Sequence, residues 1–154
     1  MKHLDVWTDG SCWPNTGSGY GGWAVVFKYG EKIKEHSGSA LDTTNNRMEM
    51  TAVLEALKAL KFPCKITLRS DSQYVINAFK KKWIENWMRT GWKTAENKPV
   101  KNQDIWQQLW EASQQHEITW VWVRGHDNED YNNRCDQLAN AARQALEREH
   151  QRKN

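Results

Sequence analysis

The spacing of apolar residues predicts strands in the first part of the chain, interrupted by one helix. Apolar and polar side chains mix or alternate in the strands, whereas apolar side chains recur every three or four residues in the helix. The turn at Tyr29-Gly30 separates two of the strands. The elements predicted here are strands at 4–8, 23–29, 32–40 and 65–70 and an amphipathic helix at 46–60.

The second half of the chain is predicted to contain helices around one further strand. Residues 118–123 are apolar on both faces, which is typical of a central strand covered on both sides. Cys135 and Leu138 begin a final apolar stripe with helical spacing. The elements predicted here are helices at 73–81, near 104–115 and from Cys135 onward, and a strand at 118–123.

This order of elements predicts an α/β fold in one domain. Three strands come first and helices then alternate with strands, which indicates a mixed sheet with a β-meander at one edge and helices on both faces. We find no repeat, linker or low-complexity segment. We therefore expect a catalytic domain at residues 1–147 and a charged, disordered tail at residues 148–154.

A glycine-rich segment, G-S-G-Y-G-G at residues 17–22, satisfies the G-x-G-x-x-G pattern of dinucleotide-binding sites. Such a site needs a helix directly after the glycines, because the helix N-terminus binds the pyrophosphate. A strand is predicted here instead. We therefore interpret the segment as a turn between two strands and exclude a dinucleotide site.

Charge is distributed unevenly along the 154 residues, although 22 basic and 19 acidic side chains leave a net charge of only +3. Residues 78–101 contain seven basic residues and two acidic ones, which favours contact with a polyanion such as nucleic-acid phosphate. Trp83, Trp87 and Trp92 lie in the same segment. We favour packing within a protrusion over stacking on bases as their role, because lysines contact phosphate without aromatic help.

The three cysteines lie far apart and form no C-x-x-C motif, so neither a disulfide framework nor a zinc site is expected. The N-terminus carries charges throughout its short apolar run, unlike a signal peptide. No apolar run reaches the roughly 18–20 residues of a membrane span. We therefore expect a cytoplasmic protein without membrane contact.

Two aspartates each follow a predicted strand. Asp9 stands in V-W-T-D-G-S and Asp71 in T-L-R-S-D-S-Q. Ligand sites in open α/β sheets lie beyond the carboxyl ends of the strands, so two acids at such positions favour a shared site. Turn or N-cap roles are the structural alternative, and the sequence leaves the two interpretations nearly balanced.

Two further carboxylates border apolar helical stripes. Glu49 lies beside Met50, and Asp136 follows Cys135. A carboxylate next to a buried stripe requires compensation, which a metal ion can supply. For Glu49 the alternative is a capping box, with Asn46 as N-cap and Glu49 three residues later.

Six motifs in register resemble type I ribonuclease H, most closely the stand-alone bacterial enzymes. They cover nearly the whole chain and are T-D-G-S-C at 8–12, T-T-N-N-R-M-E-M at 43–50, S-D-S-Q-Y-V at 70–75, W-I-E-N-W-x-x-x-G-W-K-T at 83–94, K-P-V-K-N at 98–102 and G-H…N-x-R-C-D-x-L-A at 125–139. The resemblance implies the ribonuclease H-like fold, a five-stranded mixed sheet of strand order 3-2-1-4-5 with strand 2 antiparallel and helices on both faces.

The resemblance also assigns the site. It implies catalytic, metal-binding carboxylates at Asp9, Glu49, Asp71 and Asp136, and a catalytic histidine at His126. Its substrate-binding positions fall on Gly10, Ser11, Cys12, Asn15, Thr44, Asn45, Asn46, Gln73 and Asn132, and on Lys80, Lys81, Lys82, Trp83, Trp87, Trp92, Lys93 and Thr94 of the basic segment.

The activity implied is hydrolysis of the RNA strand of RNA–DNA hybrids by a monomeric endonuclease, with little sequence preference. Two Mg²⁺ ions, with Mn²⁺ as a substitute, suit this chemistry, since carboxylates hold hard cations that activate water and stabilise the leaving oxygen. The products would carry 5′-phosphate and 3′-hydroxyl ends. His126 would assist proton transfer or product departure.

One departure from the family pattern is acidic. Asp127, Glu129 and Asp130 follow His126, where relatives commonly have small residues or proline. We interpret these three acids as solvated loop residues and Asp136 as the ligand.

Two other functions are compatible with parts of the sequence. A non-catalytic hybrid-binding module would need only the basic segment, and the complete set of four carboxylates argues against it. A DNA strand-transfer nuclease of related fold is expected to need further domains for end recognition, for which this length leaves no room.

Overall fold

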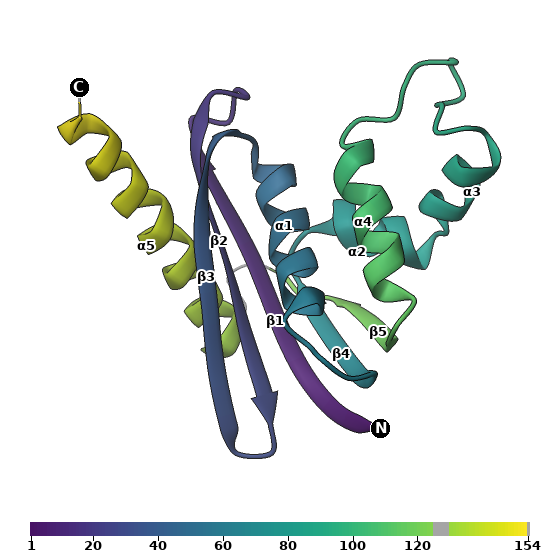
Figure 1. Ribbon diagram of the computed structural model, residues 1–154, viewed down its shortest axis with the longest axis horizontal. Helices are drawn as coiled ribbons and strands as arrows, with labels where there is room; N and C mark the ends of the chain where they lie inside the picture. The colour runs from purple at the N-terminus through teal and green to yellow at the C-terminus, as the bar shows by residue number, and fades with distance from the viewer. Residues whose placement is uncertain (125–129, 154) are drawn as a thin grey trace.

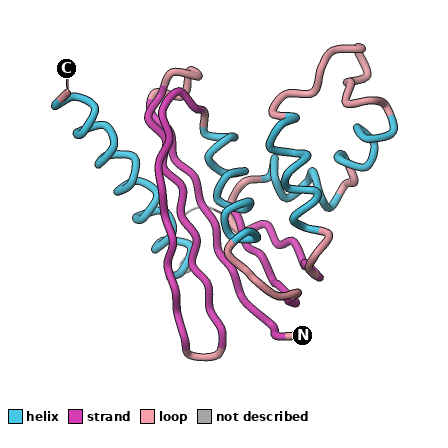
Figure 2. The backbone as a smooth tube through the Cα atoms, in the orientation of Figure 1, coloured by secondary structure: helices cyan, strands magenta, loops and turns pink. Residues whose placement is uncertain are grey.

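The computed structural model describes residues 1–124 and 130–153. Its sheet has the strand order β3-β2-β1-β4-β5, in which β2 runs antiparallel to β1 and β3 while β4 and β5 run parallel to β1 (Figures 1 and 2). This confirms the predicted mixed sheet. The elements are β1 (Lys2–Trp13), β2 (Gly19–Tyr29), β3 (Lys32–Thr43), α1 (Asn45–Lys58), β4 (Cys64–Ser70), α2 (Gln73–Lys80), α3 (Trp83–Arg89), α4 (Gln103–Ser113), β5 (Glu117–Trp122) and α5 (Asp130–Arg152).

Helices cover both faces of the sheet, as predicted. α1 packs on β1 and β2 with α2 and α4 beside it, and α5 packs on the other face against β1, β2 and β3 (Figure 1). The alternation along the strands explains the division, because Val6 and Val25 belong to the core under α1 whereas Trp7 and Val26 contact Cys135 of α5. No described helix is long and apolar enough to cross a membrane.

The glycine-rich segment differs from its prediction as a simple turn. Among its four glycines only Gly17 has a positive φ, +89°, and β2 already begins at Gly19. Gly21 and Gly22 lie inside β2 and let helices approach both faces. A Cβ on Gly21 would lie 2.6 Å from Met48 Sδ, and a Cβ on Gly22 would lie 2.0 Å from the Ala139 carbonyl oxygen of α5. These glycines therefore set how deeply α1 and α5 pack.

The basic segment forms a protrusion, residues 81–102, that extends from the α2–α4 side of the molecule (Figure 1). Its tryptophan rings contact one another and the core. The centroids of Trp87 and Trp92 are 6.1 Å apart, and those of Trp87 and Trp106 are 5.7 Å apart. Trp83 lies 6.2 Å from Trp87. The packing role favoured for these residues is therefore present in the structure.

One prediction about the later elements was wrong. β5 is an edge strand that pairs only with β4 within the described sheet. Its side chains are half-buried or exposed, so it is not a central strand covered on both faces. Trp120 stacks on Phe79 of α2 at 3.9 Å, but Trp122 is 39% exposed. At the other end of the chain, α5 continues past residue 147 to Arg152, and His150 Nδ1 lies 2.8 Å from the Tyr20 hydroxyl.

The three cysteines are free and buried. Cys12 Sγ donates to the Thr43 carbonyl oxygen at 3.3 Å on the α1 face, and Cys135 Sγ donates to the Trp7 carbonyl oxygen at 3.2 Å on the α5 face. Burial raises the pKa of both thiols, so both are protonated near neutral pH.

Candidate functional site

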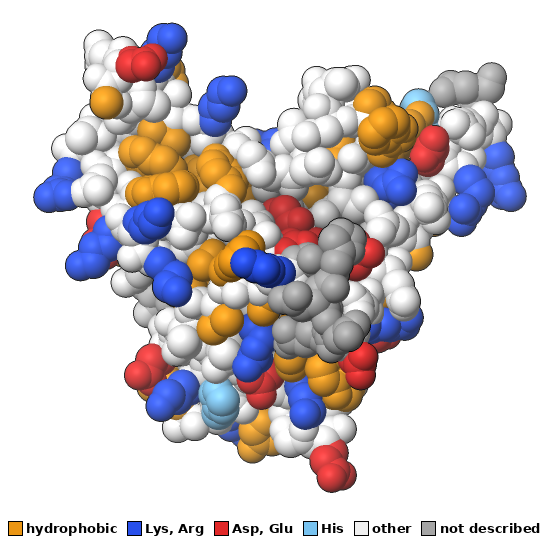
Figure 3. Space-filling model, turned by 180° about the vertical axis from the view of Figure 1, so that it is seen from behind, with side chains coloured by type: hydrophobic (Ala, Val, Ile, Leu, Met, Phe, Trp, Pro, Cys, Tyr) orange, Lys and Arg blue, Asp and Glu red, His pale blue; other side chains and the backbone are white. Residues whose placement is uncertain are grey.

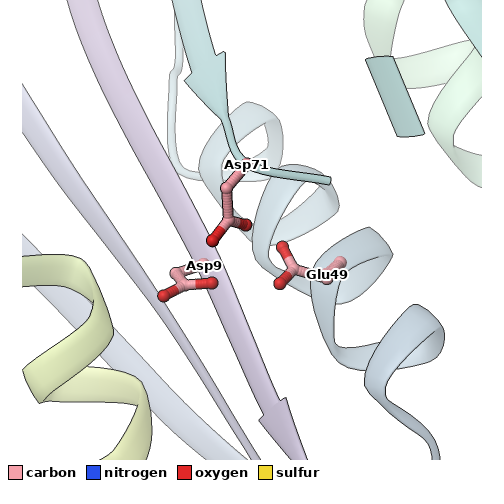
Figure 4. Close-up of side chains that lie close together, drawn as sticks. All are labelled: Asp9, Glu49 and Asp71. Atoms are coloured by element: carbon pink, nitrogen blue, oxygen red, sulfur yellow. The ribbon is translucent and has the colours of Figure 1, made fainter. Parts of the chain in front are cut away.

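Asp9, Glu49 and Asp71 converge where β1 and β4 stop pairing (Figure 4). The last parallel pair in the register joins Thr8 to Ser70, so each aspartate is the next residue along its chain. Asp71 follows the end of β4 as predicted, but Asp9 lies inside β1, which continues to Trp13 because β2 pairs with it throughout. The separation of two parallel strands therefore creates the site, although only one of them ends there.

Glu49 reaches this point from the first turns of α1. The N-cap is Thr44, whose side-chain oxygen accepts from the Arg47 amide at 3.2 Å, so the alternative capping box with Asn46 as N-cap is wrong. Gly10 permits the close approach of α1 to β1, because a Cβ there would lie 2.4 Å from the Glu49 amide nitrogen. A glycine after Asp9 is thus a geometric requirement of the site.

The three carboxylates are electrostatically strained. One oxygen from each lies within 4.8 Å of the others. Burial, followed by the charge of Asp71, raises the pKa of Asp9 to about 7. Burial and the charge of Asp9 raise the pKa of Glu49 well above its ordinary value, and burial with the charge of Asp136 raises the pKa of Asp71. Without a cation these groups therefore retain protons at pH values where isolated carboxylates are ionised.

The arrangement fits a hard divalent cation. Glu49 Oε2 is buried and has no hydrogen-bond partner, so it leaves an oxygen free to bind an ion. Carboxylate oxygens are the ligands that Mg²⁺ and Mn²⁺ favour. A cation among the three would also relieve their mutual repulsion. The residues present therefore match the metal chemistry expected from the sequence.

Asp136 lines the same cleft from α5, but it is exposed and does not belong to the close group of three. Its charge contributes to the raised pKa of both Asp9 and Asp71. Asn140 Nδ2 donates to Asp136 Oδ1 at 3.3 Å. His126, together with Asp127 and Glu129, lies outside the described residues.

The cleft has a volume of about 500 Å³ and a polar lining. Acidic side chains gather in the hollow at the centre of the view in Figure 3. Six predicted substrate-binding residues line the cleft: Gly10, Ser11, Asn45, Asn46, Gln73 and Asn132. Three further lining residues, Ser72, Tyr74 and Asn133, were not predicted. Ser72 and Tyr74 flank Gln73 in the S-D-S-Q-Y-V motif and Asn133 follows Asn132, so their position in the motifs was the available signal.

The other predicted substrate-binding residues do not line the cleft. Asn15 Oδ1 accepts from the Asn45 amide at 2.9 Å, and Thr44 caps the same helix. Cys12 does not line the cleft, since its buried thiol bonds to the Thr43 carbonyl. The residues predicted in the basic segment lie outside the cleft lining, and among them Lys80, Lys81, Lys82, Lys93 and Thr94 are exposed.

A second groove, of about 660 Å³, lies between the β2–β3 hairpin and the end of α1. Its lining consists of apolar or aromatic side chains and three basic or imidazole side chains, and it contains no carboxylate. It therefore lacks the groups that the predicted chemistry needs, and the carboxylate cleft is the candidate site.

Known proteins are similar to this chain in both sequence and fold. The RNase H family model matches residues 1–144. A ribonuclease H of Hydrogenovibrio crunogenus is 53% identical over 146 residues, which are 95% of this chain and 99% of that protein. The crystal structure of LC9-RNase H1, described as a type 1 RNase H with the type 2 active-site motif, superposes with a TM-score of 0.85 at 28% identity, over 94% of this chain and 74% of that one.

A further structure supports the fold alone. LC11-RNase H1, solved in complex with an RNA/DNA hybrid, has a TM-score of 0.69 at 21% identity, over 93% of this chain and 98% of that one. Sequence match, strand order and the acidic cleft all agree with the resemblance seen in the motifs. The chain belongs to the RNase H family and is an enzyme of the ribonuclease H type.

Proposed function

We propose that this enzyme hydrolyses the RNA strand of RNA–DNA hybrids in a Mg²⁺-dependent reaction that leaves 5′-phosphate and 3′-hydroxyl ends. The observation that carries the proposal is the convergence of Asp9, Glu49 and Asp71, with one oxygen from each within 4.8 Å, in a polar cleft. The membership of the chain in the RNase H family supports the choice of substrate.

Asp9, Glu49 and Asp71 would hold the metal, with Asp136 completing the ligand set from α5. Two Mg²⁺ ions bound there would supply activation of the attacking water and stabilisation of the leaving oxygen, and Mn²⁺ would serve as a substitute. The role of the protein is to place four acids from four separate elements around one phosphate. His126, in the segment before α5, would move a proton or help the product leave.

Asn45, Asn46 and Gln73 lie in the cleft lining, where they would select the RNA strand. Amide side chains both donate and accept, so they can recognise the 2′-hydroxyl that distinguishes RNA from DNA. Asn132 lines the same cleft and would contribute a further amide. Contacts to sugar and phosphate carry little base information, so we expect weak sequence preference.

The protrusion would hold the DNA strand through its phosphates. Lys80, Lys81 and Lys82 are exposed at its base, while the tryptophans behind them are engaged in packing. Asn15 and Thr44, beside the start of α1, would contact the same strand. We expect the enzyme to act as a monomer in the cytoplasm.

A digestion assay tests this function. Labelled RNA–DNA hybrid, single-stranded RNA and duplex DNA are incubated with Mg²⁺, with Mn²⁺ and with chelator. We expect cutting of the hybrid RNA alone, and only with metal. Equal cutting of all three substrates, or cutting that survives chelation, would contradict the proposal. Salt-sensitive binding without turnover in either metal would indicate a binding module instead.

A further inference from the structure

Ser11 connects the first strand to α5 through two side chains. It lies two residues beyond Asp9 on β1, in register with Gly22 of β2. Its hydroxyl donates to Asn140 Oδ1 at 2.6 Å and accepts from Arg143 Nε at 3.1 Å. A Cβ on Gly22 would lie 2.0 Å from the Ala139 carbonyl oxygen and 2.7 Å from the Arg143 amide nitrogen. The glycine thus lets α5 settle so deeply that both side chains reach Ser11.

The groups at the two ends set the direction of these hydrogen bonds. Arginine has donors but no acceptor, so the Ser11 oxygen accepts from Arg143. An ionised carboxylate only accepts, so the Asn140 NH₂ group faces Asp136 Oδ1 at 3.3 Å and the Asn140 oxygen accepts the Ser11 proton. The chain of donors therefore starts at a cation that is only 16% exposed and ends at a carboxylate in the active-site cleft.

Asp136 needs such support more than Asp9 and Glu49 do. Asp9 is buried and hydrogen-bonded to the Gly10 amide, and Glu49 is enclosed between α1 and β1. Asp136 is exposed on a helix, where an aspartate side chain can rotate among several rotamers. Within residues 1–124 and 130–153, the amide of Asn140 makes the hydrogen bond that restricts this carboxylate.

We propose that Asn140 is a positioning residue, which with Ser11 and Arg143 fixes the orientation in which Asp136 faces the metal site. The proposal rests on the function proposed above and adds a determinant of metal affinity outside the ligand set. Ordering the carboxylate before the ion arrives removes part of the entropic cost of binding. Asparagine suits the position, because its side chain accepts at one atom and donates at the other.

One variant is Asn140→Asp, which keeps the shape of the side chain but replaces the donor by a second acceptor facing Asp136. We expect the dissociation constant of Mn²⁺ for the substrate-free protein, measured by calorimetry, to rise about tenfold or more. Asn140→Leu, which removes the donor without adding charge, should raise it roughly three- to tenfold. Gln137→Glu is the matched control, since it adds the same charge at an exposed position of α5 and should change the constant less than about twofold.

A double-mutant cycle separates positioning from general damage. In the Asp136→Ala background, Asn140→Leu should leave the Mn²⁺ dissociation constant unchanged, because the residue acts through Asp136. Ser11→Ala should weaken metal binding, whereas Ser11→Thr, which keeps the hydroxyl, should restore most of it. For Asn140→Leu, kcat at low Mg²⁺ should fall while KM for the hybrid stays within about twofold.

Two outcomes of the metal-binding experiment would overturn the proposal: a Mn²⁺ dissociation constant in Asn140→Leu within twofold of the wild type, or an equal loss of affinity in the presence and absence of Asp136. Thermal unfolding of each variant confirms that it is folded. Normal hybrid cutting by Asn140→Leu at low Mg²⁺ would refute the positioning role and leave the proposed function intact. A wild-type protein inactive on the hybrid would refute the function itself.

Discussion

At the scale of single residues, the site depends on carboxylates that are unfavourable for the fold. Asp9 is 3% exposed, and Asp71 and Asp136 raise its pKa further by their charge. Residues kept in such an environment are concentrated at functional sites. Their cost to the free protein is therefore an argument for the metal-binding role proposed for them.

We expect Asp9→Asn to abolish turnover, with a loss of at least about a thousandfold in kcat, because a central metal ligand is removed. Binding of the hybrid should persist or strengthen, since one negative charge disappears near phosphate. Hybrid cutting and a filter-binding assay measure the two effects. Activity within tenfold of the wild type would be incompatible with Asp9 as a ligand.

The sequence located these residues but not all of their geometry. The motifs identify Asp9, Glu49 and Asp71, yet Asp9 lies inside a strand because of pairing with β2, a long-range contact that local patterns do not encode. The N-cap of α1 was misplaced because Thr44 and Asn46 are both good capping residues. Tyr74 and Asn133 enter the cleft through the positions of α2 and α5.

At the scale of elements, the protrusion and α5 have different tasks. The protrusion presents exposed lysines on a base of packed tryptophans, so charge can be removed from it without loss of core. α5 instead lies directly against the backbone of β2 at Gly22. The first element is therefore predicted to tolerate substitution, and the second is not.

Replacing Lys80, Lys81 and Lys82 by alanine should raise KM for the hybrid about tenfold and flatten its dependence on salt, because fewer counterions are released on binding. Replacing Lys32, Lys34 and Lys65, exposed at the opposite end of the sheet, removes the same charge and serves as control. Steady-state kinetics over a range of salt concentrations measures both. An unchanged salt dependence of KM in the first variant would exclude this segment as the site that binds the phosphates of the DNA strand.

Gly22→Ala should destabilise the protein by about 1–3 kcal/mol, because its Cβ would meet the rigid backbone of α5 and not a flexible side chain. Ser39→Ala, at the exposed partner position on β3, should change stability by less than about 0.5 kcal/mol. Urea unfolding compares the two. Equal stability of both variants would show that α5 does not pack as closely as described.

The pattern of apolar residues predicted the elements better than their surroundings. Residues 118–123 were expected at the centre of the sheet because both faces are apolar, but β5 is at the edge, where Trp120 is covered by α2 and Trp122 is not. Periodicity records which side chains prefer burial. It does not record how many neighbours a strand has.

At the scale of the whole molecule, the site couples stability to pH and to metal. The pKa of Asp9 in the folded, metal-free protein is about 7, above its ordinary 3.8, so the folded state binds more protons than the unfolded state between these values. The contribution of Asp9 is therefore fully present below about pH 4 and is lost as pH rises to about 7. The pKa values of Glu49 and Asp71 are shifted in the same direction.

We predict that Asp9→Asn is stabilised relative to the wild type as pH rises. Without metal, the difference in free energy of unfolding should grow by about 2–4 kcal/mol between pH 4 and pH 8. Saturating Mg²⁺ should reduce it, because the ion stabilises the wild type by mass action. Denaturant titrations at several pH values measure this, with Glu111→Gln, exposed on α4, as control. A difference that does not vary with pH would contradict the prediction.

The buried cysteines allow the opening of each face of the sheet to be timed. Cys12 lies under the α1 layer and Cys135 under the α5 layer, and both are protonated and shielded in the folded state. A thiol reagent can therefore modify each only when its own layer lifts. Labelling followed by mass spectrometry would give two separate modification rates. One reports the opening of the helix that carries Glu49, and the other the opening of the helix that carries Asp136. Unequal rates would mean that the proposed metal ligands, which come from both faces of the sheet, are lost from one face before the other.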